Sequence, residues 1–177
     1  MTDHDMIFAG FGGQGILFCG KVAAYAALLD NKEVTWLPSY GPEMRGGTAN
    51  CSVRMSNRRI GSPLISSANV LIVMNGPSFD KYIGTVNSGC NVFVDSTFVE
   101  REYRRDDISI FPLPASQLSR EKKLDGLANM IMLGKVLHET GFSTLQTVEK
   151  ALEKCVPKHK SYLLKHNIYG VKLGMEQ

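Results

Sequence analysis

The chain has 177 residues, of which 44% are hydrophobic and 21% are charged, and its formal net charge is +3. This length and composition predict a single domain over residues 1–177 and argue against a disordered chain. Because no apolar run approaches the ~20 residues of a membrane span, and because MTDHDMIF lacks a basic flank, we expect a cytoplasmic protein with no membrane contact.

Apolar strand-like segments alternate with helical ones in the first two thirds of the chain. We predict a strand at Met6–Gly10, a buried helix at Gln14–Leu29, and a second strand at Val34–Leu37 that Pro38 ends. A further helix begins at Pro77, where proline is favoured. Other strands are expected at Ala49–Met55, Asn69–Met74, Asn91–Val94 and Ile108–Phe111.

The last third is predicted to be helical. Leu127, Met130, Ile131 and Leu137 follow helical spacing. Ser143–Gln146 has the form of a capping box, and its helix should end before Pro157. Together these elements predict an α/β fold: a single three-layer domain with a mainly parallel, Rossmann-like sheet and a helical C-terminal third.

Charges and cysteines are scattered along the chain. There are three basic groups, which do not form one dense run: the Arg58–Arg59 pair, the Arg101/Arg104/Arg105 cluster and the Lys154–Lys165 stretch. We therefore expect a solvated surface for all three and no nucleic-acid partner. No two cysteines have C-x-x-C spacing, which argues against a zinc site or an iron–sulfur cluster built by this chain alone. Cys19 and Cys51 are interpreted as small core residues.

The segment FAGFGGQG, residues 8–15, follows a predicted strand and opens a predicted helix. Its glycines fit G-x-G-x-x-G, a spacing that brings backbone N–H groups close to an anion at a helix N-terminus. The ribose-binding acid expected at the end of the second strand is missing, so we do not expect NAD(P) binding. Either the loop contacts a ligand, or its glycines only let the helix pack tightly. The candidate residues are Gly10, Gly12, Gly13, Gln14 and Gly15.

A second unusual loop, SYGPEMRGGTAN, spans residues 39–50. Arg45 beside two glycines could form a forked contact with a carboxylate or phosphate, or could pair with Glu43 and fix the loop. Asn75 follows an apolar strand, where an α/β sheet presents ligands, although it could also be a loop-fixing residue. The further candidates for cofactor binding are Tyr40, Arg45, Gly46, Gly47 and Asn75.

Asn129 is expected to bond a loop backbone, because asparagine is a poor helix former. No Ser/His/Asp or paired-carboxylate arrangement is evident, so we assign no catalytic residue and no metal ligand to this chain.

The two loops together resemble the gamma subunit of the 2-oxoacid:ferredoxin oxidoreductases. The resemblance rests on GFGGQG and PSYGPEMRGGTANCSV, and it continues through IGSP, ANVLIVMN, NMIMLG and NIYGVKLG, so it covers nearly the whole chain. Within the family, EVTWLPSYGPEMRGGTANCSV is most similar to the 2-oxoglutarate type, although the pyruvate and branched-chain types share much of the pattern.

This resemblance implies a multi-subunit enzyme that converts a 2-oxoacid to acyl-coenzyme A and CO2 and passes electrons to ferredoxin. It implies partners in sister alpha, beta and possibly ferredoxin-like delta subunits. Thiamine diphosphate, magnesium and iron–sulfur clusters would reside on those subunits, since no Gly-Asp of a thiamine motif occurs here. This chain would bind no cofactor alone and would not be catalytic alone, but could lie beside coenzyme A in the complex. The alternatives are a stand-alone nucleotide-binding module and a purely structural subunit.

Overall fold

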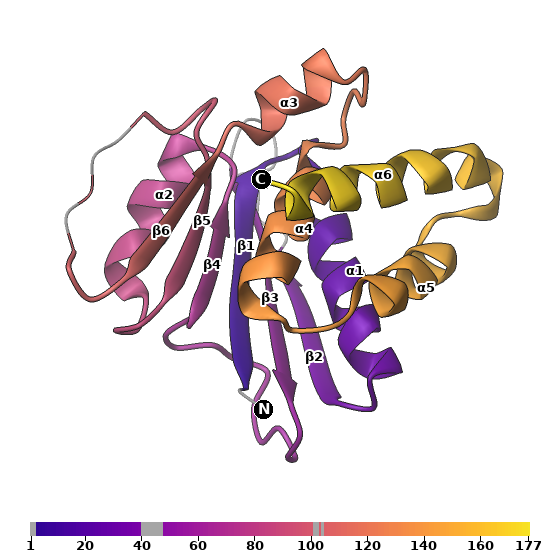
Figure 1. Cartoon of the computed structure of the whole chain (residues 1–177). Helices are drawn as coiled ribbons and strands as arrows, with labels where there is room; N and C mark the ends of the chain where they lie inside the picture. Colours follow the sequence, from indigo (N-terminus) through magenta and orange to yellow (C-terminus); the bar gives the residue numbers. More distant parts are fainter. Residues whose placement is uncertain (1–2, 40–47, 101–102, 104) are drawn as a thin grey trace.

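The computed structural model describes residues 3–39, 48–100, 103 and 105–177, and this part of the chain forms one α/β domain. Its sheet has six strands in the order β2-β3-β1-β4-β5-β6 (Figure 1). The strands are β1 (His4–Phe11), β2 (Glu33–Ser39), β3 (Thr48–Ser56), β4 (Val70–Val73), β5 (Asn91–Asp95) and β6 (Ser109–Leu113).

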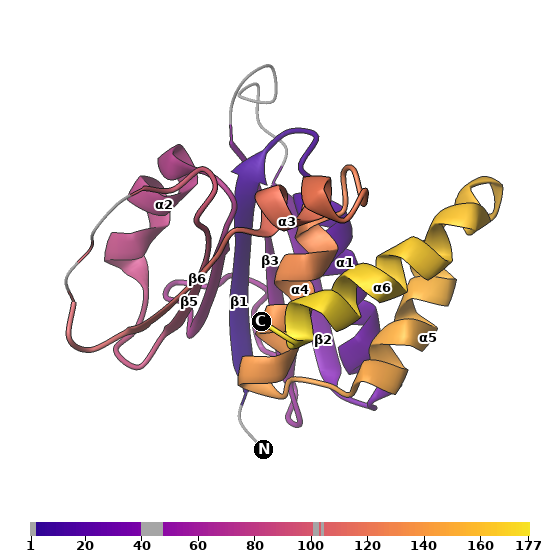
Figure 2. The same ribbon diagram turned by 45° about the horizontal axis from the view of Figure 1, so that its top comes forward.

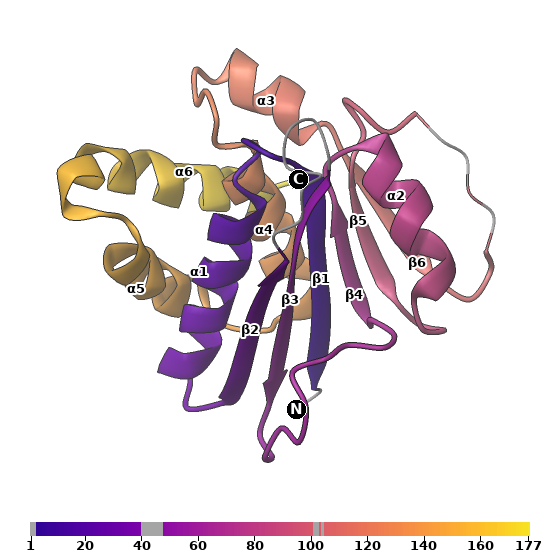
Figure 3. The ribbon, with the colours of Figure 1, turned by 180° about the vertical axis from the view of Figure 1, so that it is seen from behind.

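Helices cover the two faces of the sheet unequally. Helices α1, α4, α5 and α6 lie over one face, whereas α2 covers β4 and its neighbours on the other (Figures 1 and 3). On that second face no described helix lies over β2 and β3. The helices are α1 (Ile16–Leu29), α2 (Gly76–Tyr82), α3 (Ala115–Glu121), α4 (Ala128–Thr140), α5 (Leu145–Cys155) and α6 (Leu164–Met175), with 3-10 turns η2 (Ile83–Thr85) and η3 (Lys158–Leu163).

The central strand β1 sets the direction of the sheet. It pairs in parallel with β4, which continues in parallel through β5 to β6, whereas β3 runs antiparallel between β1 and β2. The prediction of a mainly parallel sheet is therefore confirmed, with β3 as its one reversed strand among the described residues. The carboxyl ends of β1, β4 and β5 meet at one edge, which Figure 2 turns toward the viewer.

Two local predictions were wrong. Pro38 does not end the second strand but lies inside β2, opposite Cys51. Proline lacks a backbone N–H, and this is tolerated at Pro38 because β2 is at the edge of the sheet. Ser143 is not the N-cap of α5: Thr144 holds that position and accepts from the Thr147 backbone N–H at 3.1 Å, while Ser143 Oγ donates to Asp30 at 2.6 Å.

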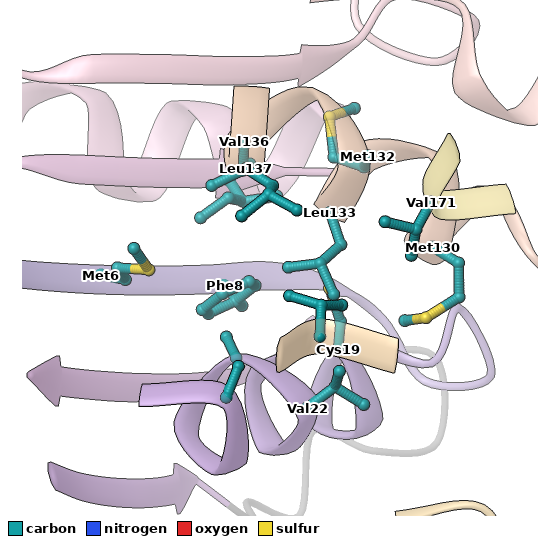
Figure 4. Packing of buried hydrophobic residues seen from close by; sticks show 14 of the residues in the cluster. Met6, Phe8, Cys19, Val22, Met130, Met132, Leu133, Val136, Leu137 and Val171 are labelled. Atoms are coloured by element: carbon teal, nitrogen blue, oxygen red, sulfur yellow. The ribbon is translucent and has the colours of Figure 1, made fainter. Parts of the chain in front are cut away.

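The larger core lies between the sheet and the helices of the more heavily covered face (Figure 4). Phe8 of β1 is fully buried there, together with Val22 of α1 and Leu133 of α4. Cys19 and Cys51 also lie in this core, as predicted. A second core of aliphatic residues joins β1, β4 and β5 to Phe79 of α2. Two cores on opposite faces explain why β4 is apolar at every position.

Helices α4 and α6 pack backbone against backbone, and Figures 1 and 2 show α6 lying across α4. A Cβ added to Gly134 would strike the Val171 carbonyl oxygen, and one added to Gly174 would strike the Ile131 carbonyl oxygen. Any larger residue would push the two helices apart. None of the described helices combines the length and apolar character that a membrane crossing needs.

Candidate functional site

The glycine loop, residues 10–15, connects the carboxyl end of β1 to the first turn of α1. Gly13 and Gly15 have φ angles of +95° and +72°, which disfavour any residue with a Cβ. Gly15 is the N-cap of α1, and no side chain caps this helix. The first N–H groups of a 14-residue helix are thus left for another acceptor, the arrangement in which helix N-termini bind anions.

Gln14 fastens this loop to the neighbouring strand. Its Oε1 accepts from the Phe11 N–H at 2.6 Å, and its Nε2 donates to the Met74 carbonyl oxygen at 2.9 Å. A Cβ at Gly10 would lie 2.7 Å from Gln14 Oε1, so glycine is needed there to admit the amide. In the structure, Gln14 therefore fixes the position of the loop.

Asn129 locks the other side of the loop to α4. Its Nδ2 donates to the Gly15 carbonyl oxygen at 3.0 Å, and its Oδ1 accepts from the Met130 N–H at 2.9 Å. This confirms the prediction that Asn129 bonds a loop backbone. A Cβ at Gly15 would overlap Asn129 Nδ2. Hydrogen bonds from Gln14 and Asn129 therefore hold the loop between the end of β4 and the start of α4.

Asn75 lies at the same edge, one residue beyond Met74. It caps α2, where its Oδ1 accepts from the Ser78 N–H at 2.8 Å. The side chain is 99% buried, yet its Nδ2 has no partner within the described part of the chain, and neither does Ser78 Oγ. A buried donor without a partner is costly. Asn75 thus combines loop fixing with an unused hydrogen-bond donor.

The Asn75 hollow has a volume of about 500 Å³ and opens beside this residue. Phe11 and Phe98 line it and are 39% and 52% exposed, so two aromatic side chains stand at its rim. It is lined by Phe11, Asn75, Gly76, Pro77, Thr97, Phe98 and Glu100.

The Arg120 hollow, of about 280 Å³, lies against the glycine loop and shares Phe98 with the Asn75 hollow. Arg120 is its one cation and Asp125 its one acid among the described lining residues. It is lined by Gly13, Gln14, Met74, Phe98, Ser116, Ser119, Arg120, Asp125, Gly126 and Ala128. The two hollows lie on either side of Phe98, beside the carboxyl ends of β1, β4 and β5.

Asp95, which holds the segments around these two hollows to the end of β5, was not identified from the sequence. Asp95 is fully buried at the end of β5, and its carboxylate accepts from Ser116 Oγ at 2.5 Å and from the Thr97 N–H at 3.1 Å. These bonds tie the start of α3 and the turn that carries Phe98 to the sheet. An acid directly after the apolar run VFV was a signal that could have identified Asp95.

The candidate residues divide into two groups. Gly10, Gly12, Gly13, Gln14, Gly15 and Asn75 come together at this edge of the sheet. Tyr40, Arg45, Gly46 and Gly47 lie outside the described residues. The strand ends that flank those four do belong to this edge, since Thr48 pairs with Phe11 and Ser39 pairs with Asn50.

The thiols offer no reactive group at this surface. Burial raises the pKa of Cys51 and Cys90 to about 12 and that of Cys155 to about 11, and it raises the pKa of Cys19 as well. Thiolates are the reactive form, so these side chains act as core residues. No group of three His, Cys, Asp or Glu side chains in the described ranges is placed to hold a metal ion.

Comparison with known proteins gives a consistent result. The family model of pyruvate ferredoxin/flavodoxin oxidoreductase matches residues 5–177. The 2-oxoglutarate synthase subunit KorC of Methanocaldococcus jannaschii is 35% identical over 153 residues, covering 85% of this chain and 82% of that protein. The ketoisovalerate oxidoreductase subunit VorA of Methanothermobacter marburgensis is 37% identical over 129 residues, covering 73% of this chain. The match covers only 27% of VorA, so the chain spans about a quarter of that relative's length.

Two solved structures share the fold. The keto/oxoacid ferredoxin oxidoreductase gamma subunit from Geobacter sulfurreducens superposes with a TM-score of 0.82 at 26% identity, covering 98% of this chain and 96% of that one. The 2-oxoglutarate:ferredoxin oxidoreductase from Magnetococcus marinus, with 2-oxoglutarate, coenzyme A and succinyl-CoA bound, gives a TM-score of 0.88 at 24% identity. It aligns with 99% of this chain, which covers 31% of that one.

Proposed function

The chain belongs to the pyruvate ferredoxin/flavodoxin oxidoreductase family as a gamma-type subunit, and we propose that it serves an assembly that oxidises 2-oxoglutarate to succinyl-CoA and CO2. The observation that carries the proposal is the match to KorC, which spans most of both proteins. Pyruvate or a branched-chain 2-oxoacid is the alternative substrate, because VorA is similarly identical over a shorter region.

The catalytic cofactors are assigned to sister subunits in this proposal. A cluster or a metal needs several convergent Cys, His or carboxylate ligands, and the buried, separate cysteines of this chain do not provide them. We therefore propose that thiamine diphosphate, magnesium and the iron–sulfur clusters bind to sister alpha, beta or delta subunits, and that ferredoxin accepts the electrons. We place the assembly in the cytoplasm.

The contribution of this chain would be a binding surface for coenzyme A. Coenzyme A offers phosphate and amide oxygens as hydrogen-bond acceptors. The donors on this chain would be the N–H groups of the glycine loop and of the uncapped start of α1, together with the unused Nδ2 of Asn75. The aromatic rims of the Asn75 hollow suit a flat or apolar portion of it. In this arrangement the chain binds and orients coenzyme A, while the bonds of the 2-oxoacid are broken on a sister subunit.

The first experiment tests substrate and assembly together. The chain is co-expressed with the subunits encoded beside it, and the purified complex is assayed with coenzyme A and a viologen dye. We expect kcat/KM for 2-oxoglutarate to exceed that for pyruvate and 2-ketoisovalerate by about tenfold or more. A preference for pyruvate would reject the substrate assignment. Turnover by the isolated chain, with added thiamine diphosphate and magnesium, would reject the division of labour.

The second experiment tests Arg45, which lies between β2 and β3 in the sequence. Loss of a charge-assisted bond costs about 1.5–3 kcal/mol, or roughly ten- to a hundredfold in affinity. We expect Arg45→Ala to raise the KM for coenzyme A while carboxyl exchange of the 2-oxoacid continues, and Arg45→Lys to recover the effect only in part. An assembled Arg45→Ala complex with an unchanged KM for coenzyme A would remove Arg45 from the site.

A further inference from the structure

The positive charge of this chain is concentrated in its C-terminal helical hairpin, residues 145–175. Residues 149–172 contain six lysines and two glutamates, a net charge of +4, whereas the whole chain carries +3. The rest of the chain is therefore close to neutral. Within Lys158–Lys172, fifteen residues include four lysines, two histidines and two tyrosines but no acid. The electrostatic potential of this molecule is accordingly most positive around the C-terminal hairpin.

The cations and tyrosines of the hairpin share an exposed face. Tyr162, Lys165, His166 and Tyr169 follow one another at offsets of three, four and seven residues, which places them on one side of η3 and α6. Tyr162 is 69% exposed and Tyr169 is 48% exposed. Lys158, Lys160 and Lys165 are also exposed, and the ion pairs found among the described residues leave these three out.

An apolar hollow lies at the root of the same hairpin. It has a volume of about 320 Å³, and Lys160 stands in its lining beside Val156 and Leu163. Asn129 and Asn167, each 97% buried, supply polar groups to its wall. The full lining is Gly15, Phe18, Gly126, Leu127, Asn129, Val156, Pro157, Lys160, Leu163 and Asn167. The exposed cations and tyrosines of the hairpin form its basic face, which consists of Lys158, Lys160, Tyr162, Lys165, His166 and Tyr169. The hairpin hollow lies between this basic face and the glycine loop, because Lys160 and Gly15 both line it.

We propose that the basic face of the hairpin docks an acidic surface of a sister subunit, which places one apolar side chain in the hairpin hollow. This rests on the proposed function, in which the chain works only within an assembly. Charge complementarity supplies the choice of partner, since a positive patch steers and orients an acidic surface. The exposed tyrosines beside these lysines are of a residue type that is enriched at protein interfaces. The hollow supplies the anchor point, because interfaces gain most from side chains buried in a pocket.

A nucleic acid or an anionic membrane fits these features less well. The lysines stand as single residues on a helix face, and no arginine lies among residues 149–172 to fork a phosphate. The hollow is lined largely by apolar side chains, which a phosphate backbone would leave empty. An acidic protein surface uses both the charges and the hollow.

The test compares two variants of equal charge change in the assembled complex. Lys158→Glu/Lys165→Glu reverses two cations of the hairpin, and Arg59→Glu/Lys81→Glu reverses two exposed cations on other parts of the chain. Each chain is titrated against the co-purified sister subunits at 0.1 M and 1 M salt, where the screening lengths are about 10 Å and 3 Å. Thermal unfolding first checks that all chains are folded.

We expect the hairpin variant to bind about tenfold or more weakly at 0.1 M salt and to lose most of the salt dependence. The control variant should bind within about twofold of the wild type. Val156→Trp, which fills the hollow without changing charge, should weaken binding at both salt concentrations alike.

Equal binding by the hairpin and control variants would overturn this inference alone. Tight binding of RNA or of vesicles containing phosphatidylserine, lost only in the hairpin variant and without any effect on assembly, would also overturn it. Failure of the wild-type chain to bind any sister subunit would overturn the proposed function and this inference together.

Discussion

Replacing Gly15 by alanine tests the interlock between the glycine loop and α4. An added Cβ would overlap Asn129 Nδ2 and lie 3.1 Å from Asn129 Cγ. The left-handed backbone at Gly15 costs an alanine about 1–2 kcal/mol. Displacing the Asn129 amide breaks its bond to the Gly15 carbonyl and leaves buried polar groups unpaired, at about 1–3 kcal/mol. We therefore expect Gly15→Ala to lower the free energy of unfolding by about 2–5 kcal/mol.

Gly89→Ala is the matched control, because Gly89 has a φ of +77° and nothing within 4 Å of an added Cβ. It should show the backbone cost alone. Both variants are compared with the wild type by urea unfolding, followed by circular dichroism. The double variant Gly15→Ala/Asn129→Ala should lose less free energy of unfolding than the two single variants lose together, because the amide that the added Cβ strikes is absent from it. Equal losses in Gly15→Ala and Gly89→Ala would refute the interlock.

Three further predictions follow from the site and the core. Gln14→Leu removes both bonds that fasten the loop, so the assembled enzyme should show a KM for coenzyme A raised by roughly tenfold; an unchanged KM would argue against a role for loop position. Burial raises the pKa of Cys51 and Cys90 to about 12, so iodoacetamide at pH 8 should label these thiols at least about a hundredfold more slowly in the folded chain than in urea; similar rates by mass spectrometry would contradict their burial. Burial lowers the pKa of His4, so the unfolded chain takes up the proton first as the pH falls below about 6.5. Stability should thus decrease from pH 7 to pH 5, and His4→Gln should reduce that decrease in urea titrations.

Much of the fold could be predicted because the signals were local. The strand before the glycine loop, the buried strand β4 that precedes Asn75 and the helix that carries Asn129 all have strong periodicity or unbroken apolar runs. Their end points also indicated the functional edge, since carboxyl ends of parallel strands gather there. The prediction for Pro38 was wrong because proline ends most strands, and the sequence does not show that β2 is an edge strand, where proline is tolerated.

The rest depended on long-range contacts that a linear pattern does not contain. The bond from Gln14 to Met74 joins residues 60 apart, and the one from Asn129 to Gly15 joins residues 114 apart. The exposure of Phe98 and its place between two hollows follow from the turn that Asp95 holds. The reversal of β3 was equally hidden, because an alternating strand has the same pattern in either direction.

The backbone contact between α4 and α6 has a consequence for the mutational tolerance of the gene. At Gly134 and Gly174 every amino-acid substitution adds a Cβ where a carbonyl oxygen of the other helix already lies. Every missense change in either codon therefore meets the same obstacle, whatever the chemistry of the new side chain. In a saturation-mutagenesis map these positions should appear uniformly intolerant, whereas core positions such as Val22 should accept aliphatic exchanges of similar volume. The packing of the C-terminal helix on α4 thus depends on one glycine in each helix that no other residue can replace.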